Sequence, residues 1–227
     1  MSTFSQVLDA NASSIHKVVD FVSGDKLLPL DFTAANTELT DEILDNTDLF
    51  STWIDEKLAG QNARYGIGGY GEHRTIYSRS AHFNTAEEPR RLHLGVDIWG
   101  PAGTPIYNFY DATVQSFANN NNFGDYGATI ILAYEIDGFK FNALYGHLSL
   151  DSLQGLEEGQ FIPAGKKIAT LGAKEENGYW PPHLHFQVIQ DLQGLKGDYP
   201  GVCKFSEKEK HLANCPDPNL ILKYSFS

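Results

Sequence analysis

The sequence has few cysteines, no long apolar run and no excess of positive charge. Only Cys203 and Cys215 occur in 227 residues, which is too few for a disulfide scaffold. No segment approaches the roughly 18 consecutive apolar residues that a membrane-spanning helix requires. The 29 acidic residues outnumber the 17 basic ones and give a formal net charge of −12. We therefore expect no membrane span and no binding to nucleic acid or to an anionic membrane, since like charges repel.

A recognisable secretion signal is also lacking. Residues 1–6 do not begin a basic segment followed by an apolar core and a small-residue cleavage site. On the sequence as given, we predict a cytoplasmic protein whose two cysteines stay reduced. A location in the cell envelope would require an export route that the sequence does not reveal.

The N-terminal part, residues 1–82, is predicted to be a helical and irregular extension. Apolar residues recur at helical spacing within residues 4–22, which indicates a short helical pair or one broken helix. A clearer helix follows, with Asn46 or Thr47 as its N-cap and Gly60 near its end. Its apolar positions are expected to pack in a core.

A glycine-rich segment, residues 66–71, matches the G-x-G-x-x-G pattern of dinucleotide-binding proteins. That pattern requires a buried strand before it and a helix after it. Here polar residues 61–64 precede it and the strand-like residues 75–77 follow. We therefore interpret the segment as a glycine-rich loop without a cofactor.

The remainder, residues 83–227, has short β-rich runs separated by turn residues, which is typical of an antiparallel β domain. We predict a mainly β fold, an antiparallel sheet or barrel-like catalytic domain with its core at residues 84–192 and a C-terminal tail. Residues 119–122 are expected to form a polar turn. The predicted strands include residues 104–107, 112–117, 128–134 and 140–145.

Histidines and one aspartate in this β-rich part have a spacing that suggests a metal site. Successive side chains of a strand point to opposite faces, so His183 and His185 are expected side by side. His93 and Asp97 would be about 13 Å apart in an extended strand, but Gly95 between them permits a bend.

Two imidazoles and one carboxylate are a common ligand set of catalytic zinc, with the fourth position left to water. His147 and the remaining histidine of the H-x-H pair would then be available for proton transfer. On spacing alone, a surface or hydrogen-bonded histidine pair is an equally good interpretation, and both remain open.

Three longer motifs resemble the lysostaphin and LytM-type zinc metallopeptidases, a family of peptidoglycan endopeptidases with the duplicated hybrid motif fold. The first is His93-Leu94-Gly95-Val96-Asp97 followed by Pro101-Ala102-Gly103-Thr104-Pro105-Ile106. The others are Tyr145-Gly146-His147-Leu148-Ser149 and Pro182-His183-Leu184-His185-Phe186, and all three occur in the family's order. The resemblance covers residues 84–192.

The resemblance implies one Zn²⁺ held by His93, Asp97 and His185. It implies that His183 and His147 are catalytic histidines that do not bind the metal. Family members are endopeptidases that hydrolyse peptide bonds, mostly in peptidoglycan cross-bridges or stem peptides. His183 would take the proton of the attacking water, and His147 would stabilise the oxyanion or protonate the leaving amine.

The sequence departs from the family pattern beside the third motif. A bulky segment, residues 177–181, stands where small residues are usual, and Gln187 stands where Glu is frequent. Tyr179 and Trp180 could stack on a substrate or simply cover the mouth of the domain. No residue matches the family's upstream tyrosine.

Two alternatives to a wall peptidase remain open. The tail, in residues 191–202 and 216–222, is similar to peptidase modules fused to class III aminotransferases and small-molecule kinases, which implies a cytoplasmic hydrolase of a small peptide or amino compound. The other alternative is a non-catalytic regulatory binding module. Residues 1–82 could cover the groove as a pro-segment or complete its wall with Glu72, His73 and Arg74, or these three could lie in a solvated loop.

Overall fold

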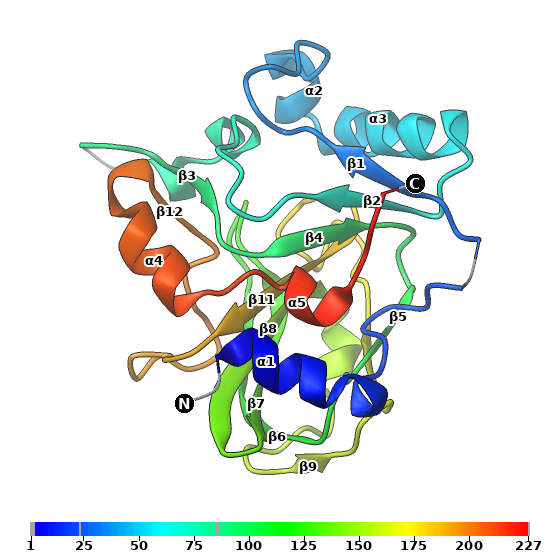
Figure 1. Cartoon of the computed structure of the whole chain (residues 1–227). Helices are drawn as coiled ribbons and strands as arrows, with labels where there is room; N and C mark the ends of the chain where they lie inside the picture. The colour runs from blue at the N-terminus through cyan, green and yellow to red at the C-terminus, as the bar shows by residue number, and fades with distance from the viewer. Residues whose placement is uncertain (1–2, 23, 85–86, 227) are drawn as a thin grey trace.

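An eight-stranded sheet forms the frame of the protein (Figure 1). The computed structural model describes residues 3–22, 24–84 and 87–226. The strand order in this sheet is β1-β2-β4-β11-β8-β7-β6-β9. Its strands are β1 Leu27–Leu30, β2 Tyr65–Gly68, β4 Val96–Trp99, β6 Ala112–Asn120, β7 Gly127–Ile136, β8 Phe139–Leu148, β9 Phe161–Ile162 and β11 His183–Ile189.

Two small sheets, five α-helices and five short 3-10 helices, among them Ile76–Arg79 and Ala81–Phe83, complete the described fold. The small sheets pair β10 (Lys167–Thr170) with β5 (Pro105–Tyr107), and β12 (Val202–Lys204) with β3 (Arg90–His93). The helices are α1 Phe4–Ala10, α2 Asp41–Asp45, α3 Thr47–Gly60, α4 Lys208–Asn214 and α5 Asn219–Leu222. In the part of the chain that the structure describes, no helix has the length and apolar character needed to cross a bilayer.

The predicted mainly β, antiparallel class is confirmed. Strands occur at all four predicted segments, as β5, β6, β7 and β8. The hairpin between β7 and β8 turns at Asp137 and Gly138, which have φ angles of 49° and 79°, and an Asp-Gly pair suits such a turn. The predicted polar turn is shorter than expected, because Asn119 and Asn120 still pair in β6.

The N-terminal part also contributes two strands to the sheet. Strand β1 pairs in parallel with β2, α2 and α3 form the connection between them, and β2 pairs antiparallel to β4 (Figure 1). The segment predicted as a glycine-rich loop therefore begins in β2. A Cβ at Gly66 would lie 2.4 Å from Leu30 Cδ1, so this glycine permits close packing of the strands.

The helix predictions for the N-terminal part are confirmed in one place and only partly met in another. Helix α3 is capped by Asn46, whose side-chain oxygen accepts the backbone N–H of Asp48 at 2.9 Å. Within residues 4–22, α1 is followed by a 3-10 helix at Ala12–Ser14, and the helical part ends there. Val18 and Val19 are buried in an extended segment, where Val19 forms a β-bridge with Ile106. Their apolar character reflects burial and not helical periodicity.

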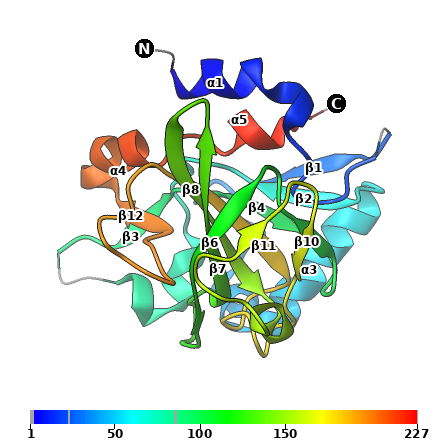
Figure 2. The same ribbon diagram turned by 90° about the horizontal axis from the view of Figure 1, so that it is seen from below.

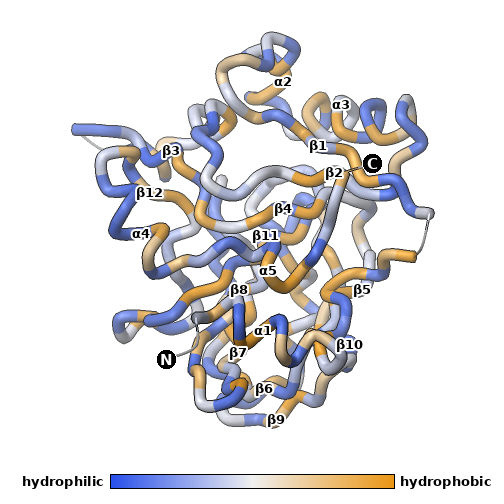
Figure 3. Tube along the Cα trace, in the orientation of Figure 1, coloured by the Kyte–Doolittle hydropathy of each residue, from blue (hydrophilic) through white to orange (hydrophobic). Residues whose placement is uncertain are grey.

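The core divides around the main sheet. Helices α1 and α5 lie side by side (Figures 1 and 2), and their apolar residues join the cluster of sheet residues that forms the main core. A second cluster packs α3 and the end of β1 against β4, through Phe32, Phe50, Trp99 and Trp180. Figure 3 shows apolar residues along β1 and β4; all four residues of β4 are buried, whereas in β1 only Leu30 is. This second cluster reaches the residues that surround the candidate site.

Candidate active site

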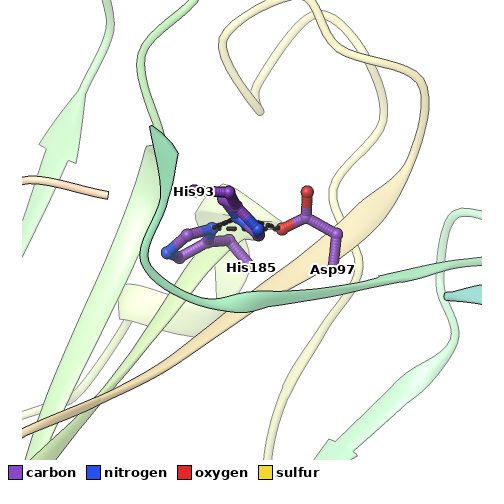
Figure 4. Close-up of side chains that lie close together, drawn as sticks. All are labelled: His93, Asp97 and His185. Carbon is purple, nitrogen blue, oxygen red and sulfur yellow. Dashed lines mark hydrogen bonds and ion pairs between the residues drawn. The ribbon is translucent and has the colours of Figure 1, made fainter. Parts of the chain in front are cut away.

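The three predicted ligand residues lie close together (Figure 4), two on neighbouring strands of the main sheet and His93 on β3 of a small sheet. His93 ends β3, and Asp97 in β4 lies directly opposite His185 in β11. Gly95 makes the approach possible, because a Cβ there would lie 2.7 Å from the His185 ring. The bend expected at this glycine brings His93 beside Asp97.

The facing atoms of these residues form a compact group, here called the donor triangle: His93 Nε2, Asp97 Oδ1 and His185 Nδ1. The distance between the two nitrogens is 3.0 Å. The carboxylate oxygen lies 3.2 Å from His93 Nε2 and 3.1 Å from His185 Nδ1. Tetrahedral zinc with bonds of about 2.0–2.1 Å places its ligand atoms about 3.3 Å apart. The donor triangle therefore matches one face of a zinc tetrahedron, and the residues fit a metal ion.

Hydrogen bonds behind the triangle set the protonation of both imidazoles. His93 Nδ1 lies 2.9 Å from the carbonyl oxygen of Gly69, and His185 Nε2 lies 2.8 Å from Oε1 of Gln187. Since both oxygens can only accept, these nitrogens carry the hydrogen and the nitrogens of the triangle are free to bind a metal. Among the described residues, no fourth His, Cys, Asp or Glu joins the group, so a position stays open to substrate or water.

Burial and charge favour the protonation states that a metal requires. Burial, followed by the positive charge of Arg74, lowers the pKa of His93 to about 4. Burial alone would raise the pKa of Asp97, but its interactions with His93 and with the positively charged Arg74 outweigh this effect and hold the pKa well below its ordinary value. At neutral pH the site therefore has an ionised carboxylate and a neutral His93.

The two further histidines, His147 and His183, lie against one another with ring centroids 4.1 Å apart. Each Nδ1 is 2.8 Å from a backbone carbonyl, that of Asn177 for His147 and that of Pro181 for His183. Each ring therefore keeps an unprotonated Nε2. Burial lowers the pKa of His183 to about 4 and the pKa of His147 well below its ordinary value. Both rings are neutral bases at neutral pH.

Backbone strain and stacking fix this pair. His147 has a φ of 61°, a left-handed conformation that is uncommon outside glycine and is concentrated at functional sites. The ring of His183 stacks on Trp99 with centroids 3.9 Å apart. Trp99 in turn packs on Phe32 and Phe50 of the N-terminal part. The position of His183 therefore depends on residues distant in the sequence.

A pocket opens over these groups. Asp97, His147, His183 and His185 line it, so the triangle and the histidine pair share one cavity. Its walls come from separate loops and short helices: residues 76–83, 124–126, 180 and 198–202. The aromatic side chains in these walls are Tyr77, Phe83, Tyr126, Trp180 and Tyr199.

Comparison with known proteins identifies the domain that carries the site. The sequence model of peptidase family M23 matches residues 91–197. These residues form an M23 domain. All five predicted site residues lie within it.

Individual relatives match over limited lengths. The chain is 27% identical over 134 residues to the peptidoglycan DD-endopeptidase ShyA of Vibrio cholerae, covering 54% of this chain and 29% of that protein. It is 32% identical over 94 residues to the uncharacterized lipoprotein YgeR of Escherichia coli, covering 41% of this chain and 33% of the relative. The chain thus spans about a third of the length of these relatives. The catalytic domain of lysostaphin from Staphylococcus simulans is 25% identical with a TM-score of 0.45, over 77% of this chain and 98% of that domain.

The structure corrects the expected position of one residue, Arg74, which neither forms a groove wall nor lies in a solvated loop. Of the three residues expected in a groove wall or a solvated loop, His73 is exposed, whereas Arg74 is fully buried and forms an ion pair with Asp97. Arg74 precedes the M23 domain and has no periodic pattern around it, so only the proximity of the glycine-rich segment offered a signal. Trp180 lines the pocket, and the Tyr179 side chain is 45% exposed.

The structure brings the five predicted site residues together, and their assigned roles stay a prediction. So do the boundary at residue 82 and the location of the protein.

Proposed function

We propose that this protein is a zinc-dependent metalloendopeptidase that hydrolyses peptide bonds in the cross-bridges or stem peptides of peptidoglycan. The observation that carries the proposal is the buried donor triangle at the base of a pocket shared with two neutral histidines. The M23 domain supports peptidase chemistry, and the relative ShyA, a peptidoglycan DD-endopeptidase, supports a wall peptide as the substrate.

The donor set supports zinc as the metal. Two imidazoles, one carboxylate and one open position are the usual shell of catalytic zinc, whereas structural sites are closed by four protein ligands. When bound, zinc supplies Lewis acidity, which polarises a carbonyl group and makes water a nucleophile at neutral pH.

The chain's own residues would move the protons. The unprotonated Nε2 of His183 can accept the proton of the attacking water, because Nδ1 is committed to the Pro181 carbonyl. His147 presents the same kind of nitrogen, so once it has accepted a proton it can donate to the oxyanion or to the leaving amine. The 4.1 Å separation of the rings keeps both functions in one cavity.

Metal analysis and digestion of purified muropeptides test the proposal. We expect one equivalent of zinc, hydrolysis that a chelator abolishes, and loss of zinc in Asp97→Ala. His183→Ala is expected to retain zinc and to lose about 100-fold to 10,000-fold in kcat, the range of a missing general base. His16→Ala, at an exposed ring remote from the pocket, is the matched control and should keep full activity.

The outcomes separate the alternatives. If short soluble peptides are hydrolysed and muropeptides are not, the protein is a hydrolase of small peptides and the proposed wall substrate is wrong. Zinc binding together with muropeptide binding but no hydrolysis would instead indicate a regulatory module. A protein that binds no zinc would refute the proposal.

A further inference from the structure

A fully buried arginine lies behind the donor triangle and precedes the M23 domain. The side chain of Arg74 has no exposed surface, and its Nη1 donates to Oδ2 of Asp97 at 2.5 Å. The other carboxylate oxygen, Oδ1, faces His93 and His185. The two oxygens of Asp97 are therefore divided, one on the guanidinium and the other in the triangle.

The guanidinium itself is held from several directions. Its Nε donates to Oε2 of Glu72 at 2.7 Å, and Nη1 also donates to the Tyr77 hydroxyl at 3.1 Å. Its Nη2 donates to the carbonyl of Gly69 at 3.3 Å, the same carbonyl that accepts from His93. The short segment 69–74 thus contacts two of the three ligand residues, and its position determines how both are oriented.

The charges in this group show why its effect is geometric. A lone guanidinium beside a divalent cation would oppose metal binding by repulsion. Glu72 carries the compensating negative charge, and its Oε1 accepts the backbone N–H of Phe32 at 3.2 Å. The pair of Arg74 and Glu72 therefore adds no net charge to the site, and its contribution to metal binding, beyond the effect of Arg74 on the pKa values of His93 and Asp97, is a fixed orientation of Asp97.

We propose that Arg74 is a positioning residue that restricts Asp97 to a single metal-facing oxygen. The inference rests on the proposed zinc site. It also assigns residues 69–74, which lie outside the M23 domain, to the metal centre. Such outer partners of ligands typically change metal affinity by about 10-fold to 100-fold when they are lost.

Zinc affinity, measured by competition with a chelating dye, is the first test. Arg74→Gln is expected to weaken zinc binding by about 10-fold to 100-fold. Gly68→Ala changes no polar group, but its Cβ would lie 2.5 Å from Arg74 Nη2 and push the guanidinium away. We expect the same direction of change in this variant. Gly60→Ala is the matched control, because a Cβ there meets no atom within 4 Å.

A destabilised protein could bind zinc poorly for unspecific reasons, so a second control is required. Leu8→Ala removes a fully buried side chain of α1, remote from the site, and should lower thermal stability without changing zinc affinity. If Leu8→Ala and Arg74→Gln weaken zinc binding equally, the positioning role is wrong.

A zinc-bound crystal structure of the wild-type protein decides the question without any variant. We expect Asp97 to bind through Oδ1 alone and Oδ2 to remain on Arg74. Coordination through both oxygens, or Oδ2 detached from Arg74, would overturn the inference, as would unchanged zinc affinity in folded Arg74→Gln and Gly68→Ala. These results leave zinc binding by the wild type intact, so they are distinct from failure of the proposed function.

Discussion

Acidification is expected to destabilise the metal-free protein through its buried histidines. Burial lowers the pKa of His93 and of His183 from 6.5 to about 4. The unfolded chain therefore binds protons as the pH falls below 6.5, whereas the folded protein does not until the pH approaches 4. The stability that these groups contribute is complete above pH 6.5 and is lost as the pH falls through this window.

The magnitude follows from the width of the window. Each pH unit between the two pKa values corresponds to about 1.4 kcal/mol for each ring. Between pH 7.5 and pH 5, His93 and His183 should each account for about 2 kcal/mol of lost unfolding free energy. His147 acts in the same direction, since burial lowers its pKa too.

Urea denaturation at both pH values, in the presence of a chelator, measures the loss. His183→Gln removes one of the titrating rings, so its loss should be about 2 kcal/mol smaller than that of the wild type. The same change at the exposed His16 is the matched control. Equal losses in the wild type and His183→Gln would refute the argument that burial keeps this ring neutral.

Two further changes test the support of the site. Gln187→Leu deprives His185 Nε2 of its acceptor and should weaken zinc binding by about 10-fold to 100-fold in a dye-competition assay, so an unchanged affinity would contradict the role of this amide. Gly178→Ala combines a φ of +82° with a Cβ 1.9 Å from the Asp125 carbonyl oxygen and should cost at least about 2 kcal/mol in urea denaturation. Gly155→Ala, with a φ of +72° and open space around its Cβ, should cost only the strain of about 1–2 kcal/mol, and equal losses would argue against the clash.

The centre of the site could be predicted because its geometry follows from local rules. Alternation along a strand places His183 and His185 on one face, and the observed register then sets His185 opposite Asp97. The glycine between His93 and Asp97 was the second local clue, and the close approach of His185 at Gly95 explains it.

The N-terminal part was predicted less well because its elements depend on distant partners. Val18 and Val19 have helical spacing, yet they pair and pack against β5 in an extended segment. From the sequence, Gly66 and Gly68 look like loop residues. In the structure they are required because Leu30 and Arg74 occupy the space that their side chains would need. No local pattern predicts such contacts.

Arg74 illustrates the same limit at the site itself. Its partners, Glu72 and Tyr77, are near in sequence, but Asp97 is not. The burial of an arginine can be predicted only when the carboxylate with which it pairs is known.

Strands hold the donor triangle and loops form the pocket walls, and this separation affects how the protein could diversify. The donor triangle depends on strand register, and a slip of one residue in β11 would turn both of its histidines to the opposite face. The cavity walls instead come from connecting segments around residues 76–83, 124–126, 180 and 198–202. Since loops tolerate insertion and exchange, the lining of the pocket can change by loop grafting while the donor triangle is inherited unchanged.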